Sequence, residues 1–132
     1  GFLRDCAHVM RPGGLVVVST PNRPVFSPGL ARAERPANPF HVEEFDAEQL
    51  EERLAHAGLI DVEVLGLRHA ARIHAWEEDH EAALVAAQIE ASTPGRELDV
   101  LVARFVAGVT VDDFEVGDAD GAQDLVAVAV AP

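Results

Sequence analysis

The side chains best suited to chemistry gather in one proline-rich stretch of the chain. His41 lies there beside Phe40, and the carboxylates of Glu43 and Glu44 follow closely. A neutral imidazole can accept a proton because its ordinary pKa lies near neutral pH, and a neighbouring carboxylate can orient the ring. We therefore predict that His41 serves as an acid or base in a reaction. The alternative is that His41 bonds to the backbone of this stretch and only positions it.

Four residues are predicted to bind a substrate. Asn22 and Arg23 lie where the expected strand of residues 15–19 opens into the proline-rich stretch, and Phe40 and Glu44 belong to that stretch. Three of them have a structural alternative. Asn22 and Arg23 could serve only the turn in which they lie, since asparagine readily bonds to nearby backbone. Glu44, like Glu43, could be a carboxylate that stabilises the start of the next helix.

A second group of ionisable residues raises the hypothesis of a metal module. On a helix His74 and Glu78 would share a face, as would Glu77 and Glu81. This spacing matches no complete ligand set, and acidic runs are usually solvated faces. We therefore predict no metal site, with the metal module as the alternative. The group consists of His74, Glu77, Glu78, Asp79, His80 and Glu81.

The first elements of the chain must position the proline-rich stretch. Apolar residues recur at helical spacing over residues 2–10, and the sequence RPGG at residues 11–14 ends that helix. Residues 15–19 are apolar without alternation, which predicts a strand buried on both faces of a parallel sheet. Residues 20–45 carry repeated prolines, which predict a loop or lid. We call residues 20–45 the lid segment.

The clearest helix signals follow the lid segment. Asp46 fits the N-cap and Gln49 the third position of a capping box, while Phe45 and Leu50 occupy the staple positions. Gly58 is the expected stop. Residues 61–65 then alternate polar and apolar, which predicts an edge strand with one solvated side.

The remaining elements have softer boundaries. Helices are expected over residues 76–90 and 97–105, split by residues 92–95. Residues 109–111 should be extended, residues 118–121 a turn and residues 124–130 a final strand. The aromatic rings of Trp76, Phe105 and Phe114 are expected to be core or lid anchors, with the wall of a substrate pocket as the alternative. Alternating helices and strands indicate an α/β protein, in which ligands bind beyond the carboxyl ends of strands, here residues 19–22.

Composition limits the classes of partner. The 132 residues suit one domain, and a net charge of −13 disfavours nucleic acid and membrane surfaces as partners. No apolar run approaches the roughly 20 residues of a membrane span. The lone Cys6, expected in the core, favours the cytoplasm. The chain starts inside a predicted helix, so we expect that residues upstream of Gly1 are missing.

Three stretches together resemble one protein family. Residues 11–22, RPGGLVVVSTPN, with the helix ahead of them, resemble the fifth-strand region of class I S-adenosylmethionine-dependent methyltransferases. Residues 38–45, NPFHVEEF, with the capped helix and half-exposed strand after them, are similar to the lid, fifth helix and sixth strand of its ubiquinone/menaquinone-biosynthesis-like branch, methyltransferase type 11/12. Residues 124–131 resemble the seventh strand of that branch.

The resemblance implies a fold and an activity. Residues 1–132 would be the C-terminal part of one Rossmann-like methyltransferase domain whose N-terminal half is missing. Its strands would be equivalent to strands 5, 6 and 7 of the family, and the seventh strand would lie antiparallel between the other two. Residues 20–45 would form a lid on the acceptor side, and residues 70–106 would be a helical insertion. The parent protein would transfer a methyl group from S-adenosyl-L-methionine to a small-molecule acceptor. In this family a histidine at the position of His41 can face the acceptor and take its proton.

The donor site of the family is missing from this sequence. The family binds the donor at a glycine-rich turn after its first strand, whereas Gly13 and Gly14 precede a strand. The cofactor-binding residues are therefore unassigned, and the chain alone is expected to be inactive. The flank of residues 15–19 should lack its neighbouring strand and could support self-association. The alternative function is a non-catalytic remnant or a partner-binding fragment.

Overall fold

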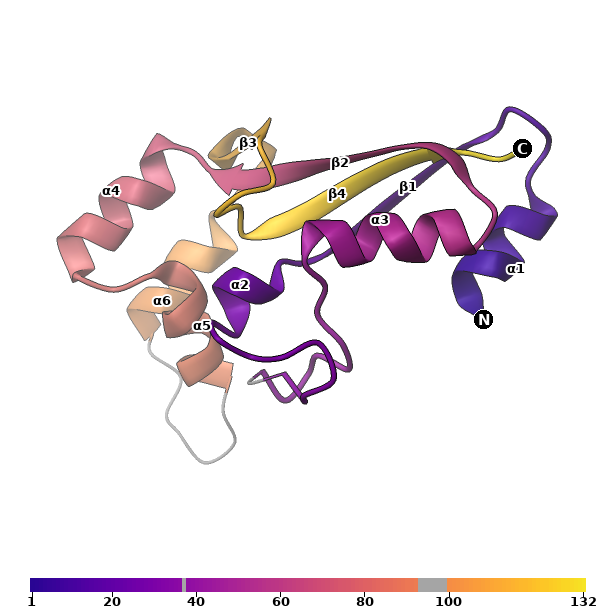
Figure 1. Ribbon diagram of the computed structural model, residues 1–132. Coiled ribbons are helices and arrows are strands. Elements are labelled where there is room, and N and C mark those ends of the chain that lie inside the picture. Colours follow the sequence, from indigo (N-terminus) through magenta and orange to yellow (C-terminus); the bar gives the residue numbers. More distant parts are fainter. Residues whose placement is uncertain (37, 93–99) are drawn as a thin grey trace.

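The computed structural model describes residues 1–36, 38–92 and 100–132. Within them the strands form a four-stranded sheet in the order β1-β4-β2-β3, and all of its pairings are antiparallel. Together with the helices this sheet gives the expected α/β class (Figure 1). The strands are β1 (Leu15–Pro21), β2 (Ile60–His69), β3 (Phe114–Gly117) and β4 (Asp124–Val130).

The last strand of the chain lies in the middle of the sheet. β4 pairs with β1 from Leu15↔Val130 to Pro21↔Asp124, and on its other side with β2. This central, antiparallel position is the one that the resemblance implies for residues 124–130. Because β1 and β2 both run opposite to β4, they run parallel to each other and their carboxyl ends lie at the same edge of the sheet. The lid segment begins at that edge.

The prediction that residues 15–19 are buried on both faces is wrong for this chain. Val16 and Val18 pack against the core, whereas Leu15 and Val17 are 66% and 64% exposed. In the described part of the chain β1 bonds to β4 alone, and two helices, α1 (Phe2–Val9) and α3 (Ala47–His56), cover only one face of the sheet. An apolar run of this kind is typical of a strand whose two faces are both packed against other elements, but the described chain packs helices on one face only. The free flank of β1 is as expected.

The prediction of an edge strand over residues 61–65 is correct for part of β2. Those residues bond to β4 on one side, but β2 continues to His69, and from Gly66 onward it also pairs with β3. The continuation was missed because Gly66 interrupts the apolar pattern, and β3, which is only four residues long, was not predicted either. A side chain at Gly66 would collide with the turn before β4: an added Cβ would lie 2.1 Å from the Asp118 carbonyl oxygen and 2.5 Å from Ala122 Cβ.

Helix α3 (Ala47–His56) is the element that the sequence specified best. The Asp46 carboxylate accepts from the Gln49 backbone N–H at 2.8 Å, which confirms the N-cap. Gly58 has φ +92°, a conformation that favours glycine, and ends the helix as predicted. Leu50 and Leu54 are buried against the β4 side chains Leu125, Ala127 and Ala129, and this contact forms the main core.

Helix α1 (Phe2–Val9) completes the cover on that face. Leu3 and Ala7 pack against the main core, but Phe2 remains 76% exposed and Cys6 is only partly buried. The expectation of a core cysteine is therefore wrong. Part of the apolar face of this helix therefore has no packing partner among the described residues.

The lid segment contains more regular structure than predicted. β1 continues to Pro21, and Arg23–Phe26 form the short helix α2, with Pro24 in its first turn. Proline is tolerated there because its missing N–H would lack a helical partner anyway. The rest of the described lid segment is irregular, as expected.

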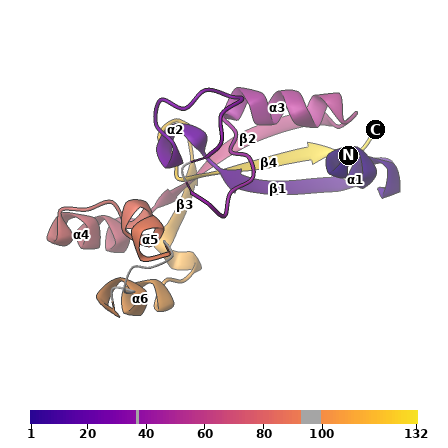
Figure 2. The ribbon, with the colours of Figure 1, turned by 90° about the horizontal axis from the view of Figure 1, so that it is seen from below.

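Residues after β2 form a helical arm with a core of its own. It contains α4 (Ala71–His80), α5 (Leu84–Ser92) and α6 (Val100–Ala107), and both views place it at the end of the sheet away from the chain termini (Figure 1, Figure 2). Its core consists of Ile73, Trp76, Leu84 and Val102, with Phe105 and Phe114 packed against them. The core role predicted for the three aromatic residues is thus confirmed.

The boundaries of the arm differ from the prediction. A single helix over residues 76–90 is wrong, because Glu81 adopts a left-handed conformation, φ 50°, and separates α4 from α5. Residues 109–111 are not simply extended: Val111–Asp113 form the short 3-10 helix η1, which leads into β3. Residues 93–99, and with them most of the predicted break and the start of the second helix, lie outside the described residues. None of the described helices has the length and apolar character needed to cross a membrane.

The close approach at Gly66 predicts a strong effect of adding one methyl group. Gly66→Ala should lower the free energy of unfolding by about 1–3 kcal/mol, the usual cost of overpacking. Gly117→Ala is the matched control, because Gly117 pairs with Gly66 across β2 and β3 but its added Cβ would meet Arg68 at 3.8 Å, an ordinary contact. Urea unfolding of both variants measures the difference; equal costs would contradict the predicted collision.

Candidate functional site

The lid segment starts and ends at the same point of the sheet edge. Asn22, directly after β1, forms an isolated parallel bridge with Phe45, and the Arg23 N–H donates to the Phe45 carbonyl at 2.9 Å. The intervening residues therefore form a loop closed at its base by backbone hydrogen bonds. All the site residues predicted from the sequence lie on this loop or at its base.

Arg23 fastens the base of the loop from inside. Its side chain is 7% exposed, and its guanidinium donates to the Gln49 side-chain oxygen at 2.7 Å and to the Glu44 carbonyl at 3.3 Å. It also donates to the Asp46 carboxylate. A buried cation requires such partners, because removing a charge from water is costly. Arg23 thus joins the end of β1, the end of the lid segment and the start of α3.

His41 and Glu44 are in direct contact within the loop. His41 Nδ1 lies 2.6 Å from Glu44 Oε1; the carboxylate is fully buried, and the histidine side chain is 20% exposed. The edge of the Phe26 ring packs on the imidazole, with ring centroids 5.3 Å apart. Asn38 Nδ2 lies 3.1 Å from the other ring nitrogen, His41 Nε2. The imidazole is therefore held on three sides by loop and helix residues.

A further carboxylate lies near this histidine. Burial raises the pKa of the Asp124 carboxyl above its ordinary value, and an electrostatic interaction with His41 opposes that shift. Asp124 is the first residue of β4 and pairs with Pro21 at the end of β1. The central strand of the sheet thus adds an acidic group to the loop site.

The structure brings some of the predicted residues together and separates others. His41 and Glu44 are in contact, and Arg23 reaches the Glu44 backbone. The Asn22 amide instead donates to the carbonyls of Ala119 and Ala122, at 3.2 and 2.7 Å, and so fixes the turn before β4. Phe40 is 67% exposed and takes no part in the cluster through its ring.

Three members of the cluster were not predicted from the sequence. Asn38 and Phe26 belong to the lid segment, where no periodic pattern indicates which side chains point inward. Asp124 opens a strand whose remaining residues are apolar, and a carboxylate at that position was the available signal. Its proximity to His41 depends on strand pairing across the whole chain.

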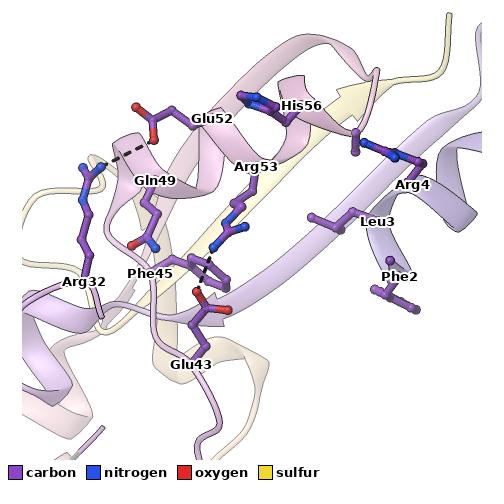
Figure 3. Close-up of a pocket in the computed structure, with 12 residues that line it drawn as sticks. Phe2, Leu3, Arg4, Arg32, Glu43, Phe45, Gln49, Glu52, Arg53 and His56 are labelled. Carbon is purple, nitrogen blue, oxygen red and sulfur yellow. Dashed lines mark hydrogen bonds and ion pairs between the residues drawn. The ribbon is translucent and has the colours of Figure 1, made fainter. Parts of the chain in front are cut away.

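A groove lies on another surface of the described chain. It has a volume of about 840 Å³ and runs between α1, α3 and the end of the lid segment (Figure 3). Glu43 and Phe45 line it, whereas Glu44 between them does not. Its charged side chains largely bond to one another, with Arg53 at 3.2 Å from Glu43 and Arg32 at 3.5 Å from Glu52. This groove therefore offers no cluster comparable with that of His41.

The alternative metal module is not assembled by the described residues. Among them, no group of three or more His, Cys, Asp or Glu side chains is placed to hold a metal ion. Glu77 Oε2 lies 3.2 Å from His74 Nδ1, but the His80 ring stacks on Trp76 and its Nδ1 bonds to the Trp76 carbonyl. His74 and His80 therefore contact different residues and do not converge on a common point.

Three known proteins are similar to this chain over nearly its whole length. Two, from two strains of Mycobacterium tuberculosis, are named "probable S-adenosylmethionine-dependent methyltransferase"; each is 41% identical over 137 aligned residues, covering 99% of the chain and 49% of the relative. A third with the same description, from Mycolicibacterium smegmatis, is 38% identical over 136 residues, covering 99% of the chain and 52% of the relative. The chain thus spans about half the length of these curated relatives. No family model matches the chain, and no solved structure matches it significantly.

The role of Arg23 predicts unequal effects of replacing two arginines that contact the same carboxylate. Arg23→Met should lower the free energy of unfolding by about 1.5–3 kcal/mol, because hydrogen bonds to a buried charged group are lost. Arg32→Met is the control, since Arg32 also bonds to Asp46 but is 45% exposed; its cost should be clearly smaller, because solvent weakens an exposed ion pair. Thermal and urea unfolding measure both, and similar costs would mean that Arg23 does not fasten the loop.

The raised pKa of Asp124 predicts a pH-dependent stability. In the folded chain Asp124 keeps its proton to higher pH than in the unfolded chain, so its contribution to stability falls as pH rises above the ordinary aspartate pKa, about 3.9. Asp124→Asn removes this dependence. As pH rises from about 4 to neutral, the free energy of unfolding of Asp124→Asn should therefore increase relative to that of the unmodified chain. A difference in unfolding midpoint that does not change with pH would contradict this.

Proposed function

We propose that this chain is part of a longer methyltransferase that transfers a methyl group from S-adenosyl-L-methionine to a small-molecule acceptor. The observation that carries the proposal is the similarity of 99% of the chain to proteins named as methyltransferases of this kind. The chain's part is the acceptor side of the site and half of a larger sheet. Within it residues 20–45 are the lid and residues 70–106 a helical insertion.

The unfinished sheet supports the assignment to a larger domain. β1 has a free flank, and its exposed Leu15 and Val17 lie on the face that no described helix covers. Apolar strand faces normally pack against a second layer. We infer that the remaining half of the longer protein supplies that layer and a strand beside β1, as the C-terminal position in a Rossmann-like sheet requires. Strands β1, β2 and β4 then correspond to the fifth, sixth and seventh strands of the family.

The described residues do not offer the donor a site of the family's kind. The glycines with positive φ are Gly13, Gly29, Gly58 and Gly121, and none of them directly follows the carboxyl end of β1 or β2. We therefore place donor binding outside this chain. When bound, S-adenosyl-L-methionine supplies an electrophilic methyl group, and the residues described here act only on the acceptor.

The acceptor-side chemistry rests on His41. A hydroxyl that gains a methyl group must lose its proton, and His41 is the imidazole of the loop site, 20% exposed and oriented by Glu44. Arg23 has its donors engaged with Gln49, Glu44 and Asp46. Since Glu44 and Asp124 are acidic, the loop site favours a neutral or cationic acceptor over a carboxylate or phosphate. Asn22, Phe40 and Glu44 remain proposed acceptor-side residues.

A second candidate function follows from the same uncovered surface. The free flank of β1 and its bare face are suited to binding a partner or a second copy of the chain. In that case the chain is a non-catalytic remnant or a partner-binding fragment. The cytoplasmic location expected from the sequence is part of either proposal.

The deciding experiment compares the chain with the polypeptide encoded by its full reading frame. We expect that frame to encode a strand followed by a glycine-rich turn, and the longer polypeptide to bind S-adenosyl-L-methionine in isothermal titration calorimetry. The 132-residue chain is the control and should give no heat of binding. A frame without such an extension, or a longer polypeptide that does not bind the donor, would leave only the partner-binding function. Donor binding by the chain alone would refute the placement of the donor site.

A further inference from the structure

The two ring nitrogens of His41 face partners of opposite hydrogen-bonding character. Nδ1 lies 2.6 Å from Glu44 Oε1, and Nε2 lies 3.1 Å from Asn38 Nδ2. An ionised carboxylate can only accept a hydrogen bond, and an amide nitrogen can only donate one. A neutral ring satisfies both partners in one way: Nδ1 carries the proton and Nε2 offers its lone pair.

The orientation of the Asn38 amide is fixed by a separate contact. Its oxygen, Oδ1, accepts from the Phe40 backbone N–H at 3.0 Å. A flipped amide would place its NH₂ group against that N–H and would lose the bond. The amide nitrogen therefore faces the imidazole, and the tautomer of His41 follows from the backbone turn at residues 38–40.

Glu44 is held in place independently of His41. Its carboxylate is fully buried, and its backbone carbonyl accepts from the Arg23 guanidinium at 3.3 Å. The second carboxylate oxygen, Oε2, is buried without a hydrogen-bond partner among the described residues. The bond to the imidazole N–H is therefore the main hydrogen bond that this carboxylate makes through its side chain. Charge-assisted bonds of this kind are about twice as strong as neutral ones.

We propose that Glu44 is a positioning residue that holds His41 in the Nδ1–H tautomer, so that Nε2 is the atom that takes the acceptor's proton. The inference rests on the proposed methyl transfer for the identity of that proton. Asn38 occupies the place of the acceptor hydroxyl at Nε2, and an incoming hydroxyl displaces its amide. The hydroxyl O–H bond then breaks: its proton moves to Nε2, and its electron pair stays on the oxygen, which forms the bond to the methyl group as the methyl–sulfur bond of the donor breaks. Glu44 stabilises the imidazolium that results.

The tautomer can be measured in the chain itself by nitrogen NMR of the imidazole rings at alkaline pH, where histidines are neutral. The His41 signals are assigned by their loss in His41→Asn. We expect the parent chain to show a protonated Nδ1 and an unprotonated Nε2 for His41. A protonated Nε2 would overturn the proposal. Because this measurement is made on the unmodified chain, it does not depend on whether a Glu44 variant folds.

Three variants test which partner sets the tautomer. Glu44→Ala should reduce the Nδ1–H form and bring in the Nε2–H form, whereas Asn38→Ala should retain Nδ1–H because the stronger, charge-assisted bond remains. Glu43→Ala is the matched control: Glu43 is the neighbouring carboxylate but bonds to Arg53, at 3.2 Å, and its loss should leave the tautomer unchanged. A greater loss of Nδ1–H in Asn38→Ala than in Glu44→Ala would refute the role of Glu44.

Neither donor nor acceptor is present in these measurements. A wrong tautomer would therefore refute the role of Glu44 and leave methyl transfer standing. Conversely, a longer polypeptide that fails to bind S-adenosyl-L-methionine would refute the methyltransferase and leave the measured tautomer as a property of the loop.

Discussion

Burying the Arg23 guanidinium imposes a requirement on everything around the loop site. A cation that is 7% exposed must find its hydrogen-bond acceptors within the protein, and Arg23 finds them on Gln49, on Asp46 and on the backbone of Glu44. These acceptors belong to the start of α3 and the end of the lid segment. The requirement therefore fixes the base of the loop relative to the sheet, and with it the carboxylate that orients His41.

The sheet and the helix packed on it form the rigid structure to which Arg23 bonds the loop. Ala127 and Ala129 of β4 face α3, and the Leu50 and Leu54 side chains of α3 fill the space between the helix and the strand. The same strand places Asp124 near His41 at its first residue. One strand thus contributes apolar contacts to the main core along its length and an acidic group at its first residue. Its opposite face remains without a covering layer in the described chain, which is the physical basis for proposing a larger domain.

The arm formed by α4, α5 and α6 is a separate packing unit. Its core around Ile73 and Trp76 has no member in common with the core under α3. It is tied to the sheet through β3 and by the Arg72–Asp113 pair, whose bonds of 2.6 Å hold the pKa of that aspartate well below its usual range. The loop site is built entirely from the sheet edge, the lid segment and the start of α3, so the chemistry proposed for His41 does not involve the arm.

The sequence by itself determined the features that depend on neighbouring residues. The N-cap at Asp46, the stop at Gly58 and the final strand all followed from local pattern, because caps, turns and alternation act within a few residues. The central place of β4 was expected from a family resemblance. Only the tertiary structure decided that Arg23 and Asn22 are engaged internally, that Phe40 faces outward, that Asn38 contacts His41, and that Asp124 is close enough to interact with His41 electrostatically. It also left one face of β1 uncovered, because burial depends on what packs across the sheet, and no pattern within a strand specifies that partner.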